Sequence, residues 1–103
     1  MRILVTGVKG QLGYDVVNEL EKRGHTAIGV DVEEMDITDA AAVEREMKAD
    51  NLDAVIHCAA YTAVEAAEDN RELCIRVNAE GTRNIARAAK ELNLKIKFLL
   101  FLS

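Results

Sequence analysis

The amino-acid sequence predicts an α/β fold built on a doubly wound parallel sheet. Short β-branched runs alternate with amphipathic helical segments along the chain, and the connections between them are short. This order of elements is typical of right-handed crossovers, which join parallel strands over the faces of one sheet. The chain has 103 residues, of which 50% are hydrophobic, so we expect a single domain with one core.

The first three elements follow from the apolar pattern. Residues 2–6 form a strand that stops at Gly7, since so apolar a run is typical of a strand buried on both faces. Residues 11–23 form a helix that ends at Gly24 and has one apolar stripe, made of Leu12, Val16 and Leu20. Residues 26–30 form the second strand.

Four more elements continue the alternation. Thr38 is the predicted N-cap of a helix over 40–50, because its hydroxyl can accept a hydrogen bond from the first helical turn. A strand over 53–58 follows. A long helix over 71–92 then repeats the helical spacing of apolar residues, and a strand-like segment over 95–102 comes last.

The charge and the cysteines exclude several classes of protein. The chain has 13 basic and 18 acidic residues, and this balance argues against a nucleic-acid or anionic-membrane partner. No apolar run reaches the ~18 residues of a membrane span. Cys58 and Cys74 form no CxxC pair, which favours reduced thiols and a cytoplasmic location. His57 is interpreted as a strand-end side chain without the clustered partners of a metal ligand.

Three glycines mark the turn between the first strand and the first helix. Gly7 permits a tight turn, Gly10 lets the backbone approach a phosphate, and Gly13 lets the helix pack closely on the sheet. The N–H groups at the start of the helix then hold a pyrophosphate. Asp31 follows at a strand end, 18 residues after Gly13. This context predicts a Rossmann-type dinucleotide site.

The glycine spacing, G-x-x-G-x-x-G after Thr6, resembles that of the extended short-chain dehydrogenase/reductase superfamily. Two further segments narrow the resemblance: 55–68, which contains Ala-Ala-Tyr-Thr-Ala-Val, and 77–82, which reads Val-Asn-Ala-Glu-Gly-Thr. With the run Gly-Gln-Leu-Gly over 10–13, they resemble the N-terminal part of the dTDP-4-dehydrorhamnose reductase family. The resemblance covers the chain from residue 1 to about 95.

The resemblance implies a cofactor site with four parts. These are the glycine turn on the pyrophosphate, an acid on the adenosine ribose, an acid and an aliphatic side chain beside the adenine, and a small-residue segment on the nicotinamide half. The residues assigned to these parts, in chain order, are Gly7, Gly10, Gln11, Leu12 and Gly13; Asp31; Asp36 and Ile37; and Ala59, Ala60, Tyr61 and Thr62.

The cofactor is NADP or NAD, and the sequence favours neither. Asp31 would repel a 2′-phosphate and so favours NAD, whereas Lys9 would attract that phosphate and so favours NADP. The resemblance to the family implies that either cofactor can be used.

The resemblance also implies an activity for the parent enzyme. It would transfer hydride from NAD(P)H to the 4-keto group of dTDP-4-dehydro-6-deoxy-L-mannose and form dTDP-L-rhamnose. In this superfamily the proton comes from a Tyr-x-x-x-Lys pair, but Tyr14 is followed four residues later by Asn18, and Tyr61 by Glu65. We therefore expect residues 1–103 to be one incomplete NAD(P)-binding domain that lacks catalytic residues and is inactive alone.

Two alternatives and one association are also expected. The chain could be a non-catalytic regulatory module, like the regulatory subunit of methionine adenosyltransferase, which resembles this family, or an inert fragment. The uncharged run over 98–102 would form an exposed strand edge, and such an edge pairs with other chains. The sequence therefore predicts a homo-oligomer, or aggregation, through residues 96–102.

Overall fold

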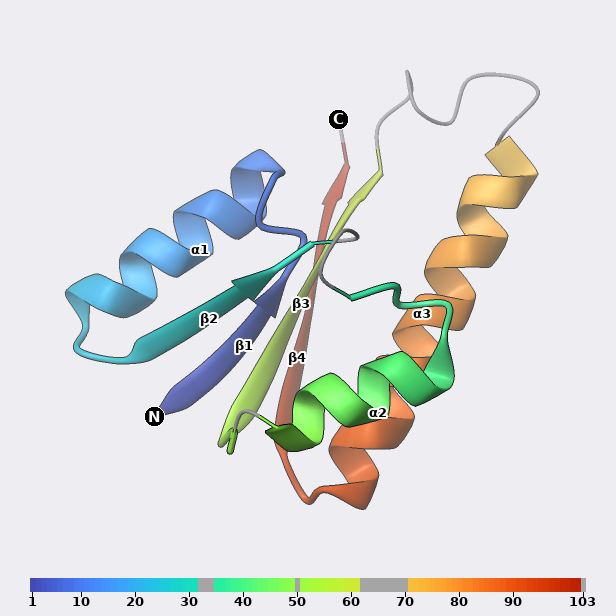
Figure 1. Ribbon diagram of the computed structural model, residues 1–103. Helices are drawn as coiled ribbons and strands as arrows, with labels where there is room; N and C mark the ends of the chain where they lie inside the picture. The colour runs from blue at the N-terminus through green and yellow to red at the C-terminus, as the bar shows by residue number, and fades with distance from the viewer. Residues whose placement is uncertain (32–34, 50, 62–70, 103) are drawn as a thin grey trace.

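The computed structural model describes residues 1–31, 35–49, 51–61 and 71–102. In these ranges, strands and helices alternate as the sequence predicts (Figure 1). The elements are β1 (Arg2–Thr6), α1 (Gln11–Lys22), β2 (Thr26–Val30), α2 (Ala40–Ala49), β3 (Ala54–Tyr61), α3 (Arg71–Glu91) and β4 (Lys95–Leu102).

The four described strands form one parallel sheet in the order β2-β1-β3-β4. The chain first moves outward from β1 to β2, then crosses back past β1 to reach β3 and β4. The direction of winding therefore reverses between β1 and β3. This topology confirms the predicted doubly wound fold, and it creates the switch point beside which such sheets bind ligands.

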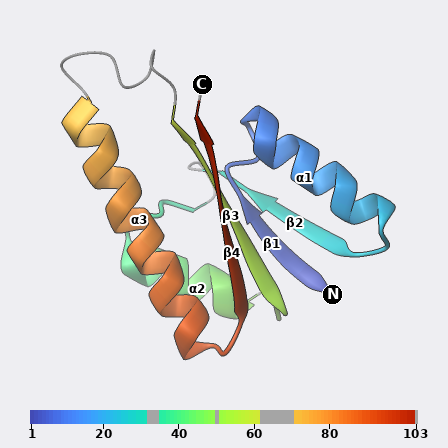
Figure 2. The ribbon, with the colours of Figure 1, turned by 180° about the vertical axis from the view of Figure 1, so that it is seen from behind.

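Helices cover both faces of the sheet, with α1 on one face and α2 and α3 on the other (Figures 1 and 2). The alternation of side chains along β1 explains both layers, because successive residues of a strand point to opposite faces. Ile3 and Val5 belong to the cluster under α1, whereas Leu4 belongs to the cluster under α2 and α3. The predicted stripe of α1 packs against the first cluster through Leu12, Val16 and Leu20.

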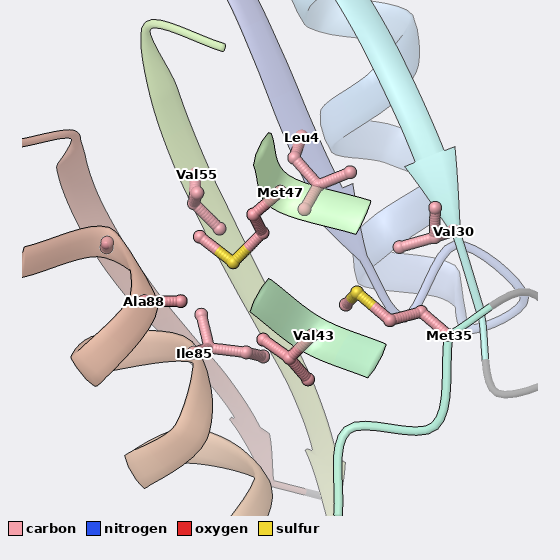
Figure 3. Packing of buried hydrophobic residues seen from close by; sticks show 9 residues of the cluster. Leu4, Val30, Met35, Val43, Met47, Val55, Ile85 and Ala88 are labelled. Carbon is pink, nitrogen blue, oxygen red and sulfur yellow. The ribbon is translucent and has the colours of Figure 1, made fainter. Parts of the chain in front are cut away.

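The larger cluster joins the sheet to α2 and α3 (Figure 3). Val43 and Met47 from α2 meet Ile85 from α3 over Leu4 and Val55 of the sheet, and all five side chains are almost fully buried. Burying each such side chain contributes roughly 1.5–3 kcal/mol to folding. This cluster fixes α3 against the sheet and so determines which of its residues face the carboxyl edge.

Three predicted ends shift by one residue: the helix over 11–23 ends at Lys22, the strand over 53–58 begins at Ala54, and the helix over 71–92 ends at Glu91. Two further differences have a clear physical reason. The strand expected to end at Cys58 continues to Tyr61, because those residues pair with β4 up to the register position Tyr61–Leu102. The N-cap of α2 is Asp39 and not Thr38. The Asp39 carboxylate accepts hydrogen bonds from the N–H groups of Ala41 and Ala42 at 3.1 and 3.2 Å.

Within the part of the chain that the structure describes, no helix combines the length and the apolar character needed to cross a bilayer.

Candidate functional site

The carboxyl ends of β1, β2 and β3 point to one edge of the sheet, and the turn between β1 and α1 lies there (Figure 1). The Gly7 N–H donates to the carbonyl oxygen of Val30, the last residue of β2, at 3.0 Å. The glycine turn is therefore tied to the neighbouring strand. It stands where open α/β sheets bind their ligands.

Gly7 occupies a position that only glycine fits. Its φ of 75° lies in the left-handed region, which disfavours a side chain. A Cβ at this position would also overlap the carbonyl oxygen of Cys58 on β3. Both the backbone conformation and the adjacent strand therefore require glycine here.

Gly13 is buried in the first turn of α1 and touches the backbone of the glycine turn. A Cβ at Gly13 would overlap the Gly7 carbonyl oxygen and would lie 2.9 Å from the Cα of Val8. The start of α1 consequently packs directly on the peptide groups that follow β1. The sequence predicted that Gly13 lets the helix pack closely on the sheet, and the contact that the structure shows is with the backbone of Gly7 and Val8 in the turn.

Gly10 is the N-cap of α1 and provides no side chain to cap it. Its N–H donates to the Gly7 carbonyl at 3.1 Å, and its own carbonyl accepts from the Tyr14 N–H at 3.0 Å. The first turn carries no acidic residue. The partial positive charge of the helix start is therefore not neutralised by a side chain of that turn, which suits an anionic ligand.

The side chains of Gln11 and Leu12 have partners outside the glycine turn. The Gln11 side chain donates to the Asp15 carboxylate at 3.0 Å along the helix, and the Leu12 side chain packs into the core under α1. The side chains of both residues are thus engaged elsewhere, and their peptide N–H groups belong to the open first turn of α1.

Asp31 lies directly after β2, beside the glycine turn. Its carboxylate accepts a hydrogen bond from the Lys9 N–H at 3.0 Å. Lys9 and Asp31, which are 22 positions apart, are therefore in contact. These are the two residues whose charges favour opposite cofactors.

Asp36 and Ile37 follow on the segment that leads to α2. The Asp36 carboxylate accepts hydrogen bonds from the Thr38 hydroxyl at 2.6 Å and from the Thr38 N–H at 2.9 Å, and these bonds lower its pKa. Ile37 is partly buried and lies against Gly81 of α3. The Thr38 hydroxyl thus orients Asp36 instead of capping α2.

The segment predicted to meet the nicotinamide half is described in part. Ala59, Ala60 and Tyr61 form the last three positions of β3, where their backbones pair with β4. Their side chains, and all of Thr62, lie outside the described residues.

His57 is a residue whose role sequence reasoning missed. It is buried inside β3 and not at a strand end, and it connects three elements. Its Nδ1 shares a hydrogen bond with the Thr6 hydroxyl of β1, and its Nε2 shares one with the Thr82 hydroxyl of α3 at 3.2 Å. The Thr6 oxygen also accepts the Cys58 N–H at 3.2 Å. Burial lowers the pKa of the His57 imidazole, which is therefore neutral at physiological pH.

A polar side chain that is buried in a central strand requires hydrogen-bond partners. From this rule, hydrogen bonds to the His57 ring could have been predicted. The structure meets it throughout, because the described residues include no buried side-chain nitrogen or oxygen without a hydrogen bond. Among the same residues, no group of His, Cys, Asp and Glu side chains is arranged to hold a metal ion.

Known proteins resemble this chain in sequence and in structure. Residues 1–99 match the family model described as RmlD substrate binding domain. A dTDP-4-dehydrorhamnose reductase from Mycobacterium tuberculosis is 37% identical over 95 residues, which are 92% of this chain. The crystal structure of a dTDP-4-dehydrorhamnose reductase from Clostridium acetobutylicum superposes with a TM-score of 0.82 at 38% identity and covers 93% of this chain.

A third relative bears on the cofactor. The dTDP-4-dehydrorhamnose reductase from Bacillus anthracis, solved in complex with NADP, superposes with a TM-score of 0.81 at 36% identity over 92% of this chain. The chain spans 31% of the length of the M. tuberculosis protein and 34% of each of the two crystallised chains. From its match over residues 1–99, the chain belongs to the RmlD substrate binding domain family, and it aligns with part of the M. tuberculosis dTDP-4-dehydrorhamnose reductase.

Proposed function

We propose that this chain is the NAD(P)-binding part of a dTDP-4-dehydrorhamnose reductase. The observation that carries the proposal is the contact of Gly13 with Gly7, which brings the uncapped start of α1 against the turn after β1. A helix start without a capping side chain or a first-turn acid leaves free N–H groups and a partial positive charge, which favour the binding of phosphate groups. The similarity to the reductases supports the same assignment.

In this proposal each part of the edge binds one part of the dinucleotide. The pyrophosphate lies against the N–H groups that follow Gly10. Asp31 accepts hydrogen bonds from the adenosine ribose, since it stands at the end of β2 beside the turn. Asp36 and Ile37 flank the adenine, and the segment that begins at Ala59 holds the nicotinamide half.

The dinucleotide is NADP or NAD. The NADP in the B. anthracis reductase supports the first. The carboxylate of Asp31 lies against the glycine turn, where it would meet a 2′-phosphate, and this supports the second. In this proposal the charges on Lys9 and Asp31 decide the preference between the two cofactors.

The bound cofactor would supply hydride for reduction of the 4-keto group of dTDP-4-dehydro-6-deoxy-L-mannose to dTDP-L-rhamnose. Neither Tyr14 nor Tyr61 has a lysine four residues later, so this chain supplies cofactor binding and no proton donor of that type. We further propose that residues 1–103 form one NAD(P)-binding domain, inactive alone, and that the reaction takes place in the cytoplasm.

The test is a fluorescence titration of the protein with NADH and NADPH. Replacing Gly10 by Asp puts a negative charge where the pyrophosphate binds, and Asp is itself a good N-cap, so the variant folds. We expect Gly10→Asp to weaken binding about tenfold or more, while Gly10→Asn, of equal size and without charge, weakens it less.

The matched control is Gly24→Asn at the other end of α1. Gly24 has a φ of 84° and open space around its Cα, and asparagine tolerates that conformation. This variant should bind as the wild type does. Absence of NADH and NADPH binding by the wild type would contradict the proposal and favour an inert fragment.

A further inference from the structure

One turn of α3, from Gly81 to Asn84, holds the segment that carries Asp36 and Ile37. We propose that Gly81 and Asn84 are positioning residues for the adenine end of the dinucleotide. They act through Ile37, whose side chain and carbonyl they hold. This inference rests on the proposed function, since it assumes that Asp36 and Ile37 flank the adenine.

Gly81 sets how close the segment comes to the helix. A Cβ at Gly81 would overlap Cδ1 of Ile37 and would lie 2.5 Å from its Cγ1 and 3.1 Å from its Cβ. The Ile37 side chain therefore lies on the bare backbone of α3. Glycine is a poor helix former, and its presence inside a 21-residue helix calls for a packing reason. The Ile37 contact provides it.

Asn84 holds the same residue by its backbone. Its side-chain Nδ2 donates to the Ile37 carbonyl oxygen at 2.9 Å. Asn84 lies three residues after Gly81 and so on the same face of the helix. One face of α3 thus fixes both the side chain and the peptide group of Ile37, and this limits the freedom of the segment to move or rotate.

The orientation of Asp36 depends on this anchor. The Asp36 carboxylate accepts hydrogen bonds from Thr38, the residue after Ile37. Asp36 and Thr38 flank Ile37, so the anchoring of Ile37 also fixes their position. Between Gly81 and Asn84, Thr82 hydrogen-bonds to buried His57 in the centre of the sheet. The segment that carries Asp36 and Ile37 is therefore connected to the sheet through α3 as well as through the end of β2.

The main test measures the affinities of the protein for two ligands that both contain a pyrophosphate group. ADP carries the adenosine as well, whereas inorganic pyrophosphate contacts only the glycine turn. We expect Gly81→Ala to displace Ile37 and to weaken ADP and dinucleotide binding about tenfold, with pyrophosphate binding unchanged. A merely structural role would lower the affinities for both probes together.

The double variant tests the route through Ile37. Ile37→Ala removes the atoms that a Cβ at position 81 would overlap. In that background the addition of Gly81→Ala should cost little further ADP affinity, although the same change costs about tenfold in the wild type. A full additional loss in the double variant would show that Gly81 does not act through Ile37.

The second variant is Asn84→Asp, which introduces no steric overlap. It tests the positioning role even if Gly81→Ala does not fold. A carboxylate cannot donate to the Ile37 carbonyl, so ADP affinity should fall while pyrophosphate affinity stays. Glu80→Ala, at an exposed position one turn before Asn84, is the control and should bind both probes as the wild type does.

The outcomes separate the two proposals. Wild-type protein that binds no NADH or NADPH refutes the proposed function and the inference with it. Wild-type binding with unchanged ADP affinity in Gly81→Ala and Asn84→Asp refutes the inference alone. Equal losses of ADP and pyrophosphate affinity in these variants also refute it, because they indicate general destabilisation.

Discussion

His57 is a histidine whose chemistry is set by its surroundings. Thr6 and Thr82 occupy its two ring nitrogens, and burial lowers its pKa below the ordinary value of 6.5. Well above pH 6.5 the imidazole is neutral in both the folded and the unfolded chain. As the pH falls below 6.5, the unfolded chain binds the proton first, so the free energy of unfolding decreases until the lowered pKa of the folded state is reached.

We therefore predict that acidification from pH 7.5 to 5.5 destabilises the protein through His57, by at most about 1.4 kcal/mol for each pH unit crossed. Urea unfolding at a series of pH values measures this effect. His57→Gln should lose less stability over this range than the wild type, because it has no imidazole at this position to protonate. An identical pH profile for His57→Gln and the wild type would contradict the assignment.

The choice of dinucleotide is also decided at single residues. Asp31→Asn removes the charge but keeps an oxygen that can accept the Lys9 N–H, so the glycine turn is preserved. We predict that this variant raises the ratio of NADPH affinity to NADH affinity about tenfold, because a 2′-phosphate no longer meets a carboxylate.

Lys9→Gln should change the same ratio in the opposite direction, since the positive charge is lost while the backbone N–H remains. Both ratios come from titrations with the two reduced cofactors under one set of salt conditions. Equal ratios in the wild type and both variants would mean that neither charge faces the 2′ position.

At the scale of elements, β4 has one neighbouring strand among the residues that the structure describes. In the described sheet β4 pairs with β3 and is an edge strand, and the predicted association involves residues 96–102. An edge strand presents unpaired peptide groups to other chains. We predict that the isolated chain forms dimers or larger assemblies at tens of micromolar.

Light scattering coupled to gel filtration measures the assembly. Leu100→Lys places a charge in the middle of the edge and should shift the population toward monomer, as charges do on natural edge strands. The control Tyr14→Lys changes an exposed residue of α1 and should leave the association unchanged. A single monomeric species of the wild-type chain would contradict the prediction.

The elements show what a local pattern can predict. Val43 and Met47 lie on one stripe of α2, and the pattern that predicts this stripe needs only neighbouring residues. The end of β3 was missed because Ala59 and Ala60 have little preference for strands, and only pairing with the distant β4 extends the strand. The N-cap of α2 was missed because Thr38 and Asp39 are both good caps, and Asp36 engages the Thr38 hydroxyl.

At the scale of the whole molecule, the two parts of the candidate site differ in how far they could be predicted. The glycine turn is continuous in sequence, so its spacing and its place after a strand were sufficient. The side-chain contacts join distant segments: Thr6 and His57 are 51 residues apart, and Ile37 and Asn84 are 47 apart. No sequence pattern within one element contains such pairs, and the topology alone brings them together.

The packing of Gly7 between its neighbours has a consequence for the entropy of ligand binding. On one side its Cα meets the Cys58 carbonyl of β3, and on the other its carbonyl meets Gly13 of α1. The distance from β3 to α1 is thus set by peptide groups, which have no rotamers. An ordered side chain costs a binding site roughly 0.5–1.5 kcal/mol when a ligand immobilises it. The contact of Gly7 with Gly13 contributes no such cost, because it involves no side chain.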